Sequence, residues 1–172
     1  MRQTCGCFAR KFLAVVLFGA VCSAPKAFAE PIVFLVRHAE KAQNGDAKDP
    51  NLSDAGRARA QALAALLKDA SITAIFATEF KRTQATAAPL AQAMKLQATI
   101  VPAKDTGALV AKLKQEHGNS LVVAHSDTIP EIARALGVTD SITLAETDYD
   151  NLFVIIRGSP AQLLRLHLPA RD

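Results

Sequence analysis

Two arginines and two histidines in this sequence form a set that suits phosphoryl transfer. Arg37 and His38 follow one apolar segment, Arg82 follows a second, and His125 follows another. Guanidinium groups offer forked N–H donors that match phosphate oxygens, so Arg37 and Arg82 are candidate phosphate-binding residues. A neutral imidazole can attack phosphorus, and a nearby arginine keeps it neutral by lowering its pKa. We therefore interpret His38 as a nucleophile and His125 as a donor to the phosphoryl oxygens.

The elements that must position these residues alternate between two periodicities. Continuous apolar runs predict strands, and amphipathic runs between them predict helices. Strands are expected at 32–36, 74–77, 97–101, 120–124, 152–156 and 163–168, and helices at about 54–70, 82–94, 107–116 and 130–136. This pattern predicts an α/β fold, a three-layer sandwich whose mostly parallel central sheet is flanked by helices.

Ligands of parallel α/β sheets bind beyond the carboxyl ends of the strands. Arg37-His38, Arg82 and His125 all follow such ends, so we expect them to meet on one rim although they lie far apart in the sequence. The first helix is expected to begin at Ser53 or Asp54, with Leu63, Leu66, Leu67 and Ala70 on its apolar face. The second helix contains Pro89, which predicts a kink or a late start.

The N-terminal 29 residues have the three parts of a cleavable signal peptide. Arg2, Arg10 and Lys11 precede an apolar run, 12–22, and Ala27-Phe28-Ala29 supplies small residues at the expected cleavage site. The prediction is a signal peptide at 1–29, cleaved after Ala29, and one domain at 30–172. It implies a periplasmic or secreted protein, which would contact a membrane only if the leader stayed uncleaved.

Removing this leader changes the meaning of the composition. The net charge of +4 comes from 20 basic and 16 acidic residues, and four of the basic residues lie in the leader, which has no acidic one. The remaining chain is balanced, so no nucleic-acid partner is expected. All three cysteines, Cys5, Cys7 and Cys22, also lie in the leader. Disulfides, cysteine-bound zinc and thiol nucleophiles are therefore not expected in the domain.

Four linked motifs make the chain resemble the histidine phosphatase superfamily, the phosphoglycerate-mutase-like proteins. They are residues 36–41 (VRHAEK), 52–56 (LSDAG), 80–87 (FKRTQATA) and 122–126 (VVAHS), in the order and spacing of the family. The resemblance implies that His38 is the phosphorylated nucleophile, that Arg37 and Arg82 bind phosphate, and that His125 is the second pocket histidine. It implies a phosphatase that needs no metal or other cofactor.

Only 42 residues separate Arg82 from His125, whereas the large family members carry long insertions there. The chain resembles the short branch, which includes phosphohistidine phosphatases, so we expect an open pocket without a lid. Larger relatives place a proton-donating carboxylate after the third strand, which corresponds to Asp105 here; Glu79 and Asp127 are the alternatives. The expected substrate is a small phosphate ester, an envelope phosphate or a phosphoprotein.

Two other kinds of function fit some of these residues. The first is a catalytically idle module that binds phosphate or another polyanion in the same pocket. The second is a metal hydrolase that uses His38, Glu40 and His125, although their spacing is not that of a common zinc motif. His117 and His167 belong to no motif, and Tyr149, the only tyrosine, is a residue that could border the pocket.

Overall fold

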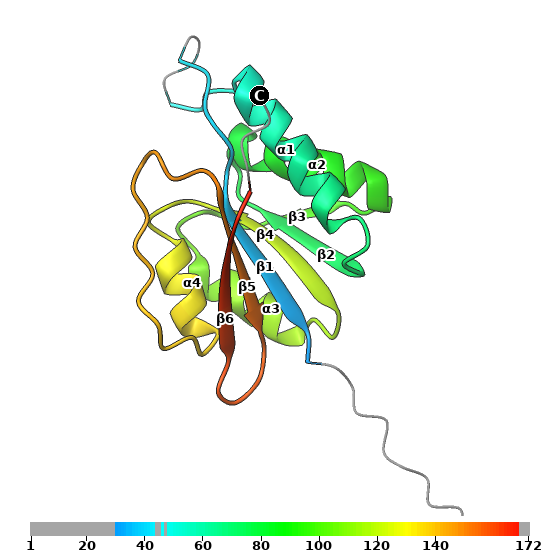
Figure 1. The fold of residues 1–172 in the computed structure, drawn as a ribbon, viewed down its shortest axis with the longest axis vertical. Helices are drawn as coiled ribbons and strands as arrows, with labels where there is room; N and C mark the ends of the chain where they lie inside the picture. The colour runs from blue at the N-terminus through cyan, green and yellow to red at the C-terminus, as the bar shows by residue number, and fades with distance from the viewer. Residues whose placement is uncertain (1–29, 44–45, 47, 169–172) are drawn as a thin grey trace, which may run out of the picture.

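Strands form where β-branched and other apolar residues run without interruption, and six of them build one sheet (Figure 1). The computed structural model describes residues 30–43, 46 and 48–168, so the predicted signal peptide lies outside the described residues. The strands are β1 (Ile32–Arg37), β2 (Ile72–Ala77), β3 (Ala98–Ile100), β4 (Asn119–Ala124), β5 (Asn151–Ile156) and β6 (Gln162–His167). Their order in the sheet is β3-β2-β4-β1-β5-β6. The first four strands in this order are parallel, β5 pairs antiparallel with β1, and β6 pairs antiparallel with β5. The predicted mostly parallel sheet is confirmed.

In the described residues, four helices cover the two faces of the sheet (Figure 1). They are α1 (Asp54–Leu67), α2 (Lys81–Met94), α3 (Thr106–Gln115) and α4 (Ile129–Ala135). Side chains of α1 and α2 share one buried cluster with one side of the sheet, and those of α3 and α4 share a second cluster with the other side. This is the predicted three-layer sandwich. In the described part of the chain, no helix has the length and apolar character needed to cross a membrane.

The local predictions for α1 and α2 need correction at three points. Leu63 and Leu67 are buried as expected, but Leu66 is 53% exposed, because the face of α1 that packs on the sheet is narrower than the predicted stripe. The helix also ends at Leu67, before the predicted residue 70. Pro89 neither delays nor ends α2, which runs from Lys81 to Met94. Burial of Ala87 and Leu90 beside Pro89 stabilises the turn in which the proline removes a hydrogen bond.

The second motif fixes α1 against the loop that carries His38. Ser53 is the N-cap of α1, and its hydroxyl accepts a hydrogen bond from Gly56 N at 3.0 Å. Ser53 N donates to Glu40 O at 2.9 Å. A Cβ on Gly56 would lie 2.3 Å from that carbonyl oxygen, so only glycine allows the helix to approach this closely. Residues 53–56 therefore act through the backbone of the loop rather than through direct chemistry.

Candidate active site

Parallel pairing of β1 and β4 brings the two histidines together. Arg37 pairs with Ala124 at the ends of these strands, and His38 N donates to Ala124 O at 2.9 Å. His38 and His125 are the next residues on each strand, and their ring centroids lie 5.4 Å apart with the rings inclined at 64°. Both side chains are buried. The two histidines therefore lie together at the carboxyl ends of the strands, as predicted.

His38 is held as a neutral imidazole with one nitrogen ready to attack. Nδ1 lies 2.8 Å from Ala39 O, and a carbonyl oxygen only accepts, so Nδ1 carries the proton. Nε2 then has the lone pair, and it has no hydrogen-bond partner among the described residues. Burial lowers the pKa of His38 to about 3, against the hydrogen bond to Ala39, and the charges of His125 and the two arginines lower it further. The ring is therefore neutral at neutral pH, with its single proton on Nδ1.

Arg37 is a buried guanidinium fixed from the segment before β5. Its Nη1 donates to Ala145 O at 3.0 Å and its Nη2 to Glu146 Oε2 at 2.8 Å. The guanidinium carbon also lies 4.3 Å from the centre of the Tyr149 ring. Its Nε is buried and has no partner among the described residues. A buried donor without a partner is costly, which is typical of a group that binds a ligand.

Arg82 reaches the same site from the first turn of α2. Its guanidinium carbon lies 4.2 Å from the centre of the Phe80 ring, and Nη1 lies 3.8 Å from Asp49 Oδ1. Its Nε is also buried without a partner among the described residues. Thr86 connects this helix to the loop after β1: its hydroxyl donates to Arg82 O at 2.7 Å and accepts from Ala39 N at 3.0 Å. The two candidate phosphate-binding arginines thus share one feature, an unsatisfied Nε–H.

His125 is anchored on the side of its ring that faces β2. Its Nε2 lies 3.0 Å from Thr78 Oγ1, and this hydroxyl lies 2.9 Å from Thr83 Oγ1. Burial lowers the pKa of His125, and the positive charge of Arg82 adds to that effect. His125 is therefore neutral in the protein without substrate.

A wide cavity of about 510 Å³ opens above these residues. Basic side chains in its lining are Arg37, Lys41, Arg82 and Lys104, and carboxylates are Glu79, Asp127, Glu131 and Glu146; both histidines also line it. Arg37 and the two histidines are buried and Arg82 is half-buried, whereas the two lysines and the four carboxylates are exposed. This arrangement suits an anionic group bound at the bottom of an open cleft.

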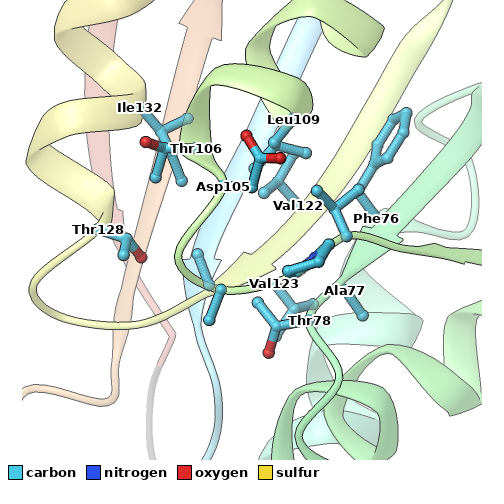
Figure 2. Close-up of a pocket in the computed structure, with 14 residues that line it drawn as sticks. Phe76, Ala77, Thr78, Asp105, Thr106, Leu109, Val122, Val123, Thr128 and Ile132 are labelled. Atoms are coloured by element: carbon cyan, nitrogen blue, oxygen red, sulfur yellow. The ribbon is translucent and has the colours of Figure 1, made fainter.

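The predicted proton donor Asp105 is not brought into this cavity. It is the N-cap of α3, and its Oδ1 accepts from Ala108 N at 2.9 Å. Figure 2 shows it among the residues that line a second, small cavity, together with Leu109 and Phe76. The alternatives Glu79 and Asp127 both line the wide cavity. A carboxylate directly before a helix is also a preferred capping residue, and this is the role that Asp105 has in the structure.

Glu40 is not available to bind a metal ion in this arrangement. Its carboxylate accepts hydrogen bonds from Arg59 Nε at 2.9 and 3.0 Å, so it orients the loop after His38. Across residues 30–43, 46 and 48–168, no three histidine, aspartate or glutamate side chains form a group that could hold a metal ion. His117 and His167 do not line the wide cavity.

Sequence reasoning missed Glu146 and Ser126 and left Tyr149 open. Glu146 Oε1 accepts from Ser126 Oγ at 2.6 Å, while its other oxygen accepts from Arg37. The hydrogen bond from Ser126, together with the charge of Arg37, lowers the pKa of Glu146. Tyr149 packs on both Arg37 and His38. In the sequence, only the acidic and aromatic residues between α4 and β5 pointed to a site in this segment. The same residues are also common in turns, so the sequence did not distinguish the two roles.

Similar folds occur in solved phosphatase structures. The protein histidine phosphatase SixA complexed with tungstate is 17% identical, with 79% of this chain and 96% of that chain covered and a TM-score of 0.66. A putative alpha-ribazole-5'-P phosphatase from Escherichia coli is 20% identical, with 83% and 98% covered and a TM-score of 0.63. A mycobacterial glucosyl-3-phosphoglycerate phosphatase with inorganic phosphate is 15% identical, with 81% and 98% covered and a TM-score of 0.62. At these identities the likeness shows a common fold.

Part of the sequence matches a protein-family model. A comparison with curated proteins gave no match. Residues 33–104 match the histidine phosphatase superfamily (branch 1), and this range contains Arg37, His38 and Arg82. The family match over residues 33–104 and the shared fold confirm the resemblance predicted from the four motifs.

Proposed function

We propose that this protein is a phosphatase that hydrolyses phosphomonoesters or phosphoramidates through a phosphohistidine intermediate on His38. The observation that carries the proposal is the pair of buried, unpartnered Nε–H donors on Arg37 and Arg82, which flank an unprotonated imidazole nitrogen. A phosphate group would satisfy both donors and would bring phosphorus to His38. The first turn of α2 adds the positive end of a helix dipole beside Arg82.

The reaction would proceed in two displacements. In the first, the lone pair of His38 Nε2 forms a bond to phosphorus while the bond to the leaving group breaks, and the leaving atom takes up a proton. In the second, water forms the new P–O bond and gives a proton to the group that protonated the leaving atom, while the N–P bond breaks and His38 becomes a neutral imidazole again. Arg37, Arg82 and His125 hold the three equatorial oxygens as their negative charge redistributes.

The leaving group would receive its proton from Glu79 or Asp127, because both carboxylates line the wide cavity. An aryl leaving group needs little help from such a donor, whereas an alkyl oxygen needs it strongly. We expect Asp127→Asn or Glu79→Gln to slow hydrolysis of an alkyl phosphate more than hydrolysis of an aryl phosphate. Equal losses on both substrates in the two variants would contradict this assignment.

The open cleft supports a broad choice of substrate. Solved structures with a similar fold include a protein histidine phosphatase, a putative alpha-ribazole-5'-P phosphatase and a glucosyl-3-phosphoglycerate phosphatase. A wide cavity of about 510 Å³ is compatible with a small ester, an envelope phosphate or a phosphoprotein. Comparing turnover on these three classes would rank them.

The test of the proposed function uses the purified protein with an aryl phosphate and a chelator. We expect turnover without added metal, loss of turnover in His38→Ala, and normal turnover in His117→Ala, whose histidine does not line the wide cavity. Quenching the reaction at alkaline pH should trap acid-labile phosphate on His38. Tight phosphate binding without turnover would instead favour the idle binding module, and activity lost with chelator would favour a metal hydrolase.

We also propose that the protein is exported, because residues 1–29 have the pattern of a signal peptide. Exported protein should begin at Glu30. N-terminal sequencing of the protein from the periplasmic fraction tests this, and recovery of the intact N-terminus in the cytoplasm would contradict it.

A further inference from the structure

The hydrogens in the hydroxyl chain behind His125 can be assigned from its contacts. His125 Nε2 lies 3.0 Å from Thr78 Oγ1, which lies 2.9 Å from Thr83 Oγ1. Thr83 Oγ1 lies 2.8 Å from Phe80 O and 3.1 Å from Thr78 O. The exposed fractions of His125, Thr78 and Thr83 are 8%, 7% and 0%, so this chain of contacts is buried. Buried polar groups at such distances are hydrogen-bonded, so the His125–Thr78 and Thr78–Thr83 contacts each require a proton, and Thr83 has one proton for its two carbonyl contacts.

The carbonyl groups at one end set the direction of every bond. A carbonyl oxygen only accepts, so the single proton of Thr83 is donated to the backbone. Thr83 Oγ1 then accepts from Thr78, which uses the single proton of Thr78. The Thr78 oxygen can therefore only accept from His125, and this requires a proton on His125 Nε2. The reverse direction would use the Thr83 proton on Thr78 and leave both carbonyl contacts of Thr83 without a proton, which is unfavourable.

The two cavities show which side of the ring this bond occupies. His125 lines the wide cavity with His38, whereas Thr78 lines only the small cavity drawn in Figure 2. Thr78 thus binds the ring nitrogen that lies away from the wide cavity. The other ring nitrogen, Nδ1, has no hydrogen-bond partner among the described residues and is not a buried unsatisfied atom. It is the nitrogen that remains accessible to a ligand.

We propose that Thr78 and Thr83 are positioning residues that hold neutral His125 in its Nε2–H tautomer and present Nδ1 to the substrate. This inference rests on the proposed phosphatase function. A neutral His125 cannot donate from Nδ1, so it first takes up a proton there from a protonated phosphate oxygen. The resulting imidazolium donates Nδ1–H back to that oxygen as negative charge develops. Nε2–H stays bonded to Thr78 in both states, so the ring does not need to turn.

The tautomer of His125 matters because its lowered pKa keeps the ring neutral. Because burial favours the neutral ring, one of its two nitrogens always lacks a proton, and the position of the proton decides which nitrogen can accept. Without the threonine chain, both tautomers of a neutral imidazole would be populated. Only part of the protein would then present an accepting Nδ1.

The experiment reads the tautomer directly. In protein labelled with [15N]histidine, long-range 1H–15N correlation spectra distinguish the two neutral tautomers, and His125→Asn identifies the signal among the four histidines. We expect the Nε2–H pattern for His125 in the wild type. Thr78→Val removes the acceptor and should give a mixture, whereas Thr78→Ser should keep the pattern. Thr83→Val should give the Nδ1–H pattern, because the Thr78 proton then has no other acceptor and is donated to His125 Nε2.

Kinetics on an aryl phosphate give the second readout. Loss of one net hydrogen bond predicts a kcat about fivefold lower for Thr78→Val. Thr78→Ser should restore most of this loss, and Thr139→Val, on the exposed surface, is the matched control. An Nδ1–H pattern in the wild type, or an unchanged pattern in both valine variants, would overturn the proposal. An Nε2–H pattern that responds as expected in a protein without turnover would support the threonine chain and refute the phosphatase function separately.

Discussion

Glu146 accepts a hydrogen bond from Arg37, which binds phosphate in the proposed function, so its charge should oppose phosphate binding. Its Oε2 accepts from Arg37 at 2.8 Å, and the side chain is 76% exposed. Glu146→Gln removes the negative charge and keeps the shape, and an amide oxygen can still accept from Arg37 or Ser126. The change therefore tests charge with little change in packing. We expect it to tighten the binding of inorganic phosphate.

The size of the effect follows from Coulomb's law. Two anionic groups on one guanidinium lie about 5 Å apart, where unit charges repel by about 0.8 kcal/mol in water and about 3 kcal/mol at an effective dielectric constant near 20. The exposure of Glu146 favours the lower figure, and phosphate carries between one and two charges. A gain of about 1.4 kcal/mol lies within this range and corresponds to about tenfold in Kd. Added salt should reduce the gain, because the carboxylate is exposed.

Isothermal titration with inorganic phosphate, at neutral pH and low ionic strength, measures this change. Glu131→Gln is the matched control, since its carboxylate lines the same cavity but accepts from Thr106 rather than from an arginine. The control should bind phosphate with a smaller gain. Unchanged or weaker binding in Glu146→Gln would refute the reasoning, and it would mean that Glu146 mainly orders Arg37 for the substrate.

Three further predictions concern His38, Asp105 and Gly56. The pKa of His38 is lowered to about 3, so kcat/KM should show no loss from His38 protonation near pH 6.5. The unfolded chain binds this proton at higher pH than the folded protein does, so the free energy of unfolding should fall as the pH drops from 6.5 toward 3. In urea titrations, His38→Ala should lessen this fall by up to about 1.4 kcal/mol per pH unit. Asp105→Ala should lower the free energy of unfolding by about 1 kcal/mol through loss of the α3 cap, with kcat unchanged, and a large kcat loss would restore Asp105 as the proton donor. Gly56→Ala should cost about 1–3 kcal/mol of stability and lower activity, because its Cβ would lie 2.3 Å from Glu40 O; an unchanged Tm and kcat would show that the loop after His38 can yield.

The fold and the four central side chains were predictable because each depended on a local pattern. The apolar runs marked the strands, and parallel pairing alone then placed His38 beside His125 at the ends of β1 and β4. The two arginines followed from their positions after a strand and at a helix start. The order and periodicity of the sequence therefore indicate where these four residues lie, because a strand end is defined by the residues on either side of it.

The partners of these residues depended on side-chain geometry that no local pattern specifies. Glu146 lies 109 residues from Arg37, in a segment outside the named helices and strands, and the sequence does not indicate which of several nearby carboxylates turns inward. Asp105 shows the same difficulty in reverse, since the position that favours a proton donor also favours a helix cap. The two cases have one physical basis: a carboxylate bonds to whichever N–H donor lies within reach, a backbone amide or a guanidinium. Reach is set by backbone angles at single residues, so the sequence motifs can fix the positions of the two histidines and two arginines while leaving the surrounding charges free to differ.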